Sequence, residues 1–191
     1  MNNLILKALR LFSVSIALLF GAVCSMTVFA QSKEFYSYTT KTVDGNPFLL
    51  SSLKGKKVLV VNVASACGLT PQYEQLQELY DEYKELGFEI IAFPANNFGN
   101  QESGTNGEIK EFCSMNFNIS FPIMSKISVK GDDMDPIYQW LTEQKHNKKK
   151  DSSVAWNFQK YLINRDGTLH GIVSPKTSPN DPTIINWIKS K

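Results

Sequence analysis

Residues 57–94 decide the fold and read KVLVVNVASACGLTPQYEQLQELYDEYKELGFEIIAFP. The apolar, β-branched segment at 57–63 is typical of a strand buried in the centre of a sheet. Apolar side chains then recur at helical spacing, at Leu76, Leu79, Tyr80 and Tyr83. Gly87 ends the predicted helix, and a second buried strand is predicted over 88–93. The order strand, helix, strand indicates an α/β fold.

The turn between the first strand and the helix carries a cysteine, Cys67. Thr70-Pro71 follows it and offers a good N-cap and first helical position. Ligands gather at this place in α/β folds, and the partial positive charge of a helix N-terminus favours thiolate over thiol. Cys67 is therefore predicted to be a nucleophile. The alternative is a small buried hydrophobic residue, because free cysteines are often buried.

Turn and capping signals predict the other elements. The first is a hairpin whose first arm is 35–43 and whose turn is Asp44-Gly45. A helix opened by the capping box Thr105 to Glu108 then carries Ile109, Phe112 and Cys113, and it is followed by a short helix over 136–141 and a polar surface loop over 145–153. Strands over 158–164 and 169–174 are joined at Asp166-Gly167, and a last helix starts at Asp181-Pro182 with Ile184, Ile185 and Ile188 on one face. Together they predict an α/β sandwich with one central mixed β-sheet flanked by helices.

Composition limits the classes of protein to consider. The chain has 191 residues, of which 42% are hydrophobic and 20% charged, which suits one folded domain and excludes a disordered chain. A net charge of +2 argues against a nucleic-acid binder that works by mass of charge. Three cysteines are too few for a disulfide scaffold, and the two histidines show no zinc-site spacing with them.

The N-terminus has the pattern of a secretory signal peptide. Lys7 and Arg10 are the only charged side chains among the first 30 residues, and an apolar run over 11–30 ends in the sequence VFA. A basic start, an apolar middle and a small-residue end predict cleavage after Ala30. The mature domain is then 31–191, and the protein is expected to be exported, either to a periplasm or out of the cell.

Two other interpretations of this segment exist. A retained membrane anchor needs about 20 apolar residues, which the run nearly provides, but its Ser, Thr and Gly residues favour cleavage. Lipid attachment at Cys24 is disfavoured because Val23 stands where a small residue is expected. Cleavage would leave Cys67 and Cys113 as the cysteines of the mature domain, and a structural disulfide between them stays open at this point.

Three further features carry chemistry only in combination. The segment 93–104 is rich in glycine and amides, including Gln101, and alone is typical of a turn. Trp156 and Asn157 can donate hydrogen bonds to an anion without adding charge, although a tryptophan at such a place is more often a core residue. Cys113 lies on the apolar face of its predicted helix, which indicates burial.

The segments 62–70, 98–102 and 156–158 together resemble the three signature blocks of the glutathione peroxidase family. They read NVASACGLT, FGNQE and WNF, in the order and with the spacing of that family. The resemblance runs over 35–188, nearly the whole predicted mature chain. It implies a thioredoxin-like fold, which agrees with the element order above, and a thiol peroxidase activity.

The resemblance also implies roles for individual residues. Cys67, Gln101, Trp156 and Asn157 match the family's catalytic tetrad, with cysteine where some members hold selenocysteine. The Cys67 thiolate is expected to attack a hydroperoxide and become a sulfenic acid, while the other three donate hydrogen bonds to the thiolate and the departing oxygen. Cys113 resembles the resolving cysteine of two-cysteine members, whose disulfide an external dithiol reduces. No cofactor and no metal is implied.

The chain departs from the family pattern at two loop positions. Ala95 stands where many members have a cysteine, and Asn97 where they have a glutamine. The polar stretch 145–153 is shorter than the interface loop of tetrameric members. This resembles the monomeric branch, whose usual reductant is thioredoxin. We identify no basic cluster that would select the carboxylates of glutathione, although glutathione remains an alternative reductant.

Two functions compete with an exported thiol peroxidase. A thiol-disulfide oxidoreductase on the same fold usually needs Cys-x-x-Cys, and Thr70 stands where the second cysteine would be. A silent or redox-sensing binding module stapled by a Cys67–Cys113 disulfide would not require Gln101 or its tetrad partners. Typical peroxiredoxins have a threonine three residues before the nucleophile, where this chain has Ala64.

Overall fold

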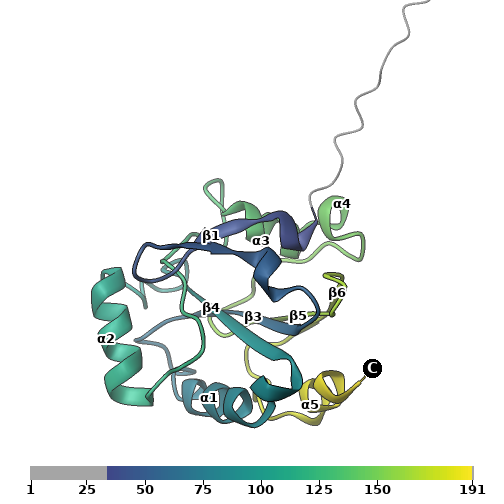
Figure 1. Cartoon of the computed structure of the whole chain (residues 1–191). Helices are drawn as coiled ribbons and strands as arrows, with labels where there is room; N and C mark the ends of the chain where they lie inside the picture. Colours follow the sequence, from purple (N-terminus) through teal and green to yellow (C-terminus); the bar gives the residue numbers. More distant parts are fainter. Residues whose placement is uncertain (1–33, 191) are drawn as a thin grey trace, which may run out of the picture. The chain divides into compact units, whose positions relative to one another are not determined.

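A computed structural model describes residues 34–190, so the predicted signal segment at 1–30 lies outside the described residues. Its main sheet has the strand order β4-β3-β5-β6 (Figure 1). The central strand β3, Lys57–Val63, runs parallel to β4, Phe88–Pro94. On its other side β3 is antiparallel to β5, Lys160–Ile163, which is antiparallel to β6, Leu169–Val173. The predicted mixed sheet is confirmed.

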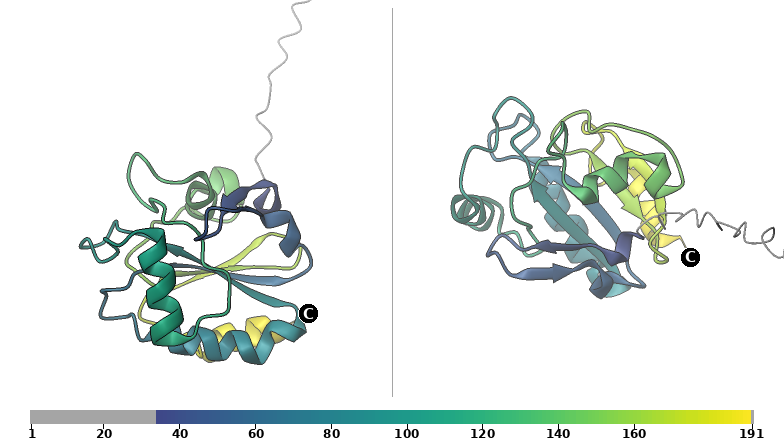
Figure 2. Two further views of the ribbon diagram at one scale, coloured as in Figure 1. Left: turned by 60° about the vertical axis from the view of Figure 1, so that its left-hand side comes forward. Right: turned by 90° about the horizontal axis from the view of Figure 1, so that it is seen from above.

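Both faces of this sheet are covered. Every residue of β3 is buried, and its side chains alternate between two apolar clusters. One face packs against α1, Gln72–Tyr83, and α5, Pro182–Lys189, while α3, Pro136–Thr142, lies over the other face with the N-terminal hairpin (Figures 1 and 2). This is the layered α/β arrangement of a thioredoxin-like fold.

The N-terminal hairpin is shorter than predicted. Its strands are β1, Thr39–Lys41, and β2, Pro47–Leu49, and Gly45 adopts a positive φ of 82° in the turn. The expectation that alternation begins at residue 35 is wrong, because η1, Phe35–Ser37, is a 3-10 helix there. Its aromatic side chains are buried in the core, and the apolar spacing reflects that burial.

The helix signals are largely confirmed. In α2, Asn106–Phe117, the predicted capping box forms, since Glu108 N donates to Thr105 Oγ1 and Thr105 N donates to Glu108 Oε2. Asp181 caps α5 as expected. The predicted face of α5 needs one change: Ile185 is only half-buried, and Trp187 joins Ile184 and Ile188 in the core.

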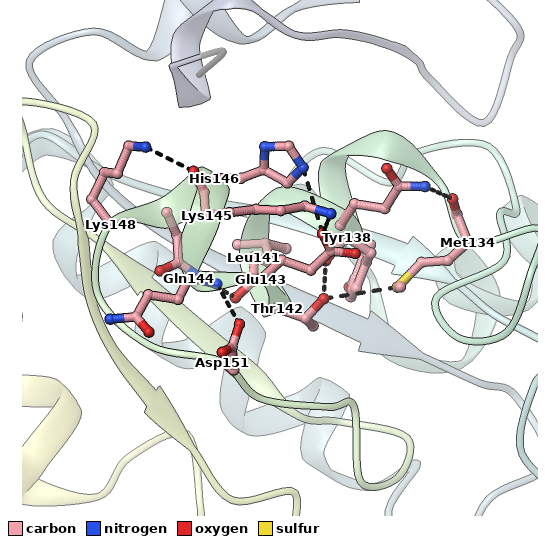
Figure 3. Close-up of polar contacts among 12 residues, drawn as sticks. Met134, Tyr138, Leu141, Thr142, Glu143, Gln144, Lys145, His146, Lys148 and Asp151 are labelled. Carbon is pink, nitrogen blue, oxygen red and sulfur yellow. Dashed lines mark hydrogen bonds and ion pairs between the residues drawn. The ribbon is translucent and has the colours of Figure 1, made fainter. Parts of the chain in front are cut away.

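The polar stretch 145–153 is more ordered than a simple surface loop, which corrects that prediction. It begins within α4, Gln144–Asn147, and the buried Asn147 side chain binds backbone groups on both sides of it. Figure 3 shows polar contacts around α4, where Glu143 pairs with Lys145 and His146. The segment is therefore folded largely on itself.

Candidate active site

Cys67 lies in the turn between β3 and α1 and is only 7% exposed. Thr70 holds this turn closed, because its hydroxyl donates to Ala64 O at 2.8 Å and accepts from Cys67 N at 3.1 Å. Thr70 is thus not the N-cap of α1, which corrects the sequence prediction. The helix begins at Gln72 after Pro71, and no side chain caps it.

A backbone amide of the turn, and not the helix dipole, interacts with the Cys67 sulfur. Leu69 N donates to Cys67 Sγ at 3.4 Å. Since α1 begins five residues after Cys67, and the dipole effect falls off within the first turn of a helix, the amide of the turn is the group positioned to stabilise a thiolate. The sequence analysis therefore placed Cys67 in the correct turn, but it assigned stabilisation of the thiolate to the helix N-terminus where the structure has the Leu69 amide.

Gln101 joins the Cys67 turn to the third segment of the site. Its backbone oxygen accepts from Ala66 N at 3.0 Å, next to Cys67. Its side-chain Oε1 accepts from Asn157 Nδ2 at 2.9 Å. The three segments that carry the predicted tetrad, far apart in the chain, are therefore connected through Gln101.

The 156–158 segment is fixed to the end of β3 by Asn62. Asn62 Nδ2 donates to Trp156 O at 3.1 Å, and Phe158 N donates to Asn62 O at 2.6 Å. Phe158 has a φ of 67°, a left-handed conformation that costs about 1–3 kcal/mol for a non-glycine residue. Its ring is fully buried, edge-on to Tyr73. Packing and the Asn62 hydrogen bonds therefore hold an unfavourable backbone next to Asn157.

Trp156 and Asn157 differ in exposure. Asn157 is fully buried, whereas Trp156 is 39% exposed and its ring packs against Phe98 at a centroid distance of 5.4 Å. The alternative interpretation of Trp156 as a core residue is therefore wrong. An exposed indole beside a buried carboxamide can meet a molecule that arrives from solvent.

The amide-rich loop after β4 is anchored at both departures from the family pattern. Asn97 pairs with the backbone of a neighbouring loop, accepting from Val129 N at 2.9 Å and donating to Lys130 O at 3.0 Å. Ala95 is fully buried and donates its N–H to Val63 O at 3.0 Å. Asn97 therefore has a structural use in this chain that its sequence context did not reveal.

Two charged residues that the sequence analysis did not single out support the same loop. Glu102 is 1% exposed, and burial raises the pKa of its carboxyl group, while Ser65 and Lys126 oppose the rise. Lys126 Nζ donates to Glu102 O at 3.2 Å and to Gly104 O at 2.6 Å. The loop that carries Gln101 is thus held by side chains as well as by backbone hydrogen bonds.

Cys113 is fully buried on α2, as its apolar face predicted. Burial raises the pKa of its thiol to about 11, and the neighbouring Tyr73 hydroxyl partly offsets this rise. Cys67 and Cys113 are both free thiols, so no disulfide joins these two residues in the structure.

Within residues 34–190, no helix has the length and apolar character needed to cross a membrane. Across the same residues, no group of three or more His, Cys, Asp and Glu side chains is placed to hold a metal ion. The chemistry that the site offers is that of a thiol whose sulfur accepts a hydrogen bond from a backbone amide, in a turn that is joined to two uncharged carboxamides.

Comparison with known proteins agrees with this geometry. The family described as "Glutathione peroxidase" matches residues 35–142. The glutathione peroxidase-like peroxiredoxin gpx1 of Schizosaccharomyces pombe is 49% identical over 151 residues, covering 77% of this chain and 95% of that protein. The glutathione peroxidase of Lactococcus lactis is 43% identical over 147 residues, covering 77% and 93% of the two chains.

Solved structures show the same relationship. The crystal structure of Trgpx in apo form has a TM-score of 0.65 at 36% identity, covering 83% of this chain and 97% of that one. A thiol:disulfide interchange protein of the thioredoxin family from Chlorobium tepidum has a TM-score of 0.53 at 21% identity, covering 83% and 97%, and shows the shared fold alone. The chain is therefore a thiol peroxidase with a thioredoxin-like fold, and it belongs to the glutathione peroxidase family.

Proposed function

We propose that this chain reduces hydroperoxides at Cys67, with Gln101, Trp156 and Asn157 stabilising the charge that develops. In this step the thiolate sulfur attacks the distal peroxide oxygen and the O–O bond breaks. The sulfur keeps that oxygen as a sulfenic acid, and the departing oxygen takes a proton to become water or an alcohol. The observation that carries the proposal is the chain of hydrogen bonds from the Cys67 turn through Gln101 to Asn157.

The geometry gives each carboxamide a direction. Because Gln101 Oε1 accepts from Asn157, the NH₂ group of Gln101 faces away from that contact and is oriented to donate elsewhere. Uncharged donors that are already oriented stabilise a departing oxyanion without reorganising during the reaction. The Leu69 amide supplies the matching donor to the sulfur.

For the second half of the cycle we propose Cys113 as the resolving cysteine. Its thiol attacks the Cys67 sulfenic acid, a sulfur–sulfur bond forms, and the sulfenic oxygen leaves as water with the Cys113 proton. The Cα atoms of a disulfide lie within about 7 Å of each other, and Cys113 is fully buried on a separate helix, so we propose that α2 moves to deliver Cys113. Only Ile109 and Cys113 of α2 are fully buried, which favours local opening of about 104–118.

The reductant that we propose is a thioredoxin-like dithiol, with glutathione as the alternative. The S. pombe relative carries the name peroxiredoxin, and a dithiol can return both cysteines to thiols in two exchange steps. We further propose that residues 1–30 are a cleaved export signal and that the protein acts outside the cytoplasm as a monomer. The compact 144–153 segment, folded on its own side chains, supports the monomer.

Replacement of the nucleophile tests the proposal. Cys67→Ser is expected to abolish peroxide consumption while the fold remains, because a serine hydroxyl is scarcely ionised near pH 7. Sulfenic-acid trapping followed by mass spectrometry should label residue 67 in the wild type and in Cys113→Ser. If Cys67→Ser keeps a tenth of the wild-type rate, the assignment is wrong.

A further inference from the structure

A lysine is buried beneath the 156–158 segment. Lys160 lies on β5 opposite Val61 of β3, close to the end of β3 that leads to Cys67, and its side chain is fully buried. Lysine is almost never fully buried unless it is paired. In the described part of the chain, however, Lys160 forms no ion pair, so something other than a carboxylate must satisfy its ammonium group.

Neutral oxygens from different elements supply that partner set. Lys160 Nζ donates to Gln72 Oε1 at 2.7 Å, to Phe158 O at 2.8 Å and to Thr177 O at 2.8 Å, with Pro175 O farther away at 3.3 Å. An ammonium group has three hydrogens, which match the three short contacts. The group therefore connects α1, the 156–158 segment and the loop between β6 and α5.

Two of these acceptors belong to the active site's own supports. The Phe158 carbonyl is the next peptide oxygen after Asn157, in the residue with the left-handed backbone. Gln72 is the first residue of α1, directly after the turn that Cys67 and Thr70 build. Gln72 Nε2 also donates to Pro175 O at 2.8 Å, which fixes the orientation of the oxygen that faces Lys160.

We propose that Lys160 is a positioning residue of the peroxidase. Its buried ammonium group holds the Phe158 carbonyl and the start of α1. Through these groups it keeps Asn157 and the Cys67 turn in the relative positions that the reaction with peroxide requires. Lys160 acts through these groups and does not touch the peroxide. The inference rests on the proposed function, since it assigns a support to the Cys67 and Asn157 roles.

The protonation state of Lys160 offers a direct test. Burial lowers the pKa of its ammonium group to about 7, and the groups that face it from β5, α1 and the 175–177 loop are uncharged. A neutral amine has two hydrogens for three short contacts, so one contact is lost on deprotonation. The support should therefore weaken as the pH rises through about 7, while a purely structural lysine would leave the rate unchanged.

The experiment measures the second-order rate constant of Cys67 oxidation by hydrogen peroxide in a stopped flow, from about pH 6 to pH 9. The variants are Lys160→Met, which keeps the length of the side chain, and the control Lys57→Met. Lys57 is also buried, but it lies at the opposite end of β3 and its Nζ donates to Ser190 Oγ. Small misplacements of reacting groups change rates by about ten- to a hundredfold.

We expect Lys160→Met to react at least about tenfold more slowly than the wild type at pH 6, and the two to converge at pH 9 because the wild type loses its support there. Lys57→Met should follow the wild type throughout. Equal rates and equal pH profiles for the wild type and Lys160→Met would overturn the proposal.

A folding failure of Lys160→Met does not leave the question open. The wild-type rate constant, divided by the Cys67 thiolate fraction read from the absorbance at 240 nm of Cys113→Ser, then decides: a falling limb with a midpoint near pH 7 supports the proposal, and a flat profile up to pH 9 overturns it. Activity of Cys67→Ser would instead refute the proposed function itself. An inactive Cys67→Ser together with an unaffected Lys160→Met would refute only the role of Lys160.

Discussion

The Thr70 hydroxyl makes two hydrogen bonds that hold the Cys67 turn, and replacing Thr70 tests whether they do so. Thr70→Val keeps the shape of the side chain and removes both the donor to Ala64 O and the acceptor for Cys67 N. Both contacts are buried, and an unpaired buried polar group costs about 1–3 kcal/mol. The control Thr70→Ser keeps the hydroxyl and loses only a methyl group.

Thr70→Val is expected to lower the free energy of unfolding by about 3 kcal/mol. This is less than the maximum cost of two unpaired buried groups, because the neighbouring Ala66 and Gly68 are exposed and water can reach part of the turn. For a domain of this size that lowers Tm by about 6–12 °C. The rate constant of Cys67 oxidation should fall as well, by about tenfold, since the turn also positions the Leu69 amide on the sulfur.

Thermal unfolding by circular dichroism and stopped-flow oxidation with hydrogen peroxide measure the two effects on the same samples. Thr70→Ser should stay within about 1 kcal/mol of the wild type and keep most of the rate, because its hydroxyl can make the same two contacts. If Thr70→Val matches Thr70→Ser in both Tm and rate, the hydroxyl does not hold the turn and the reasoning fails.

Other predictions concern the tetrad, the resolving step and pH. Gln101→Ala or Asn157→Ala should each slow Cys67 oxidation about a hundredfold, and Asn157→Ala should also lower Tm because Asn157 is fully buried and hydrogen-bonded; unchanged rates in both would make the pair structural. Cys113→Ser should consume one equivalent of peroxide and then stall, and wild type treated with peroxide should yield a Cys67–Cys113 peptide pair by mass spectrometry; Cys67 joined to glutathione in place of that pair would favour the one-cysteine route. The folded pKa of Lys160, about 7, lies below its ordinary 10.5, so the unfolded chain binds more protons between these values. The free energy of unfolding of the wild type, relative to Lys160→Met, should therefore rise with pH across this window in urea titrations, and a flat difference would show that the ammonium group is not desolvated.

The sequence predicted the sheet because its signals are local. A continuous apolar, β-branched run gave both ends of β3, Lys57–Val63, as the structure has them. The capping box at Thr105 and Glu108 gave the start of α2 for the same reason, since donor and acceptor lie three residues apart. The hairpin arm predicted from residue 35 was wrong at η1, Phe35–Ser37, because burial against distant elements, and not the local pattern, determines the structure there.

The site was only partly predictable, because its supports act over long sequence distances. The motifs placed Cys67 and Gln101 in the correct loops, but nothing near Gln101 in the chain shows that its side chain meets Asn157. In the sequence, Asn97 stood out only as a departure from the family pattern, and Lys160 did not stand out at all. Their meaning comes from acceptors on segments that only the folded chain brings within hydrogen-bond distance.

Thr70 also connects the fold to the route of the proposed resolving step. Structures of thiol:disulfide interchange proteins share this fold at low identity, and in a Cys-x-x-Cys turn the second thiol lies in the same turn as the first. Here that position is a threonine whose hydroxyl already has two buried partners. The turn holds no second sulfur, so the thiol that resolves a Cys67 sulfenic acid has to come from another element of the chain or from an external thiol. Cys113 is the remaining cysteine among the described residues, it is buried, and its thiol resists ionisation. In the resolving step that we propose, opening of α2 would bring Cys113 toward Cys67 and would also return the Cys113 thiol to water, where ionisation is easier.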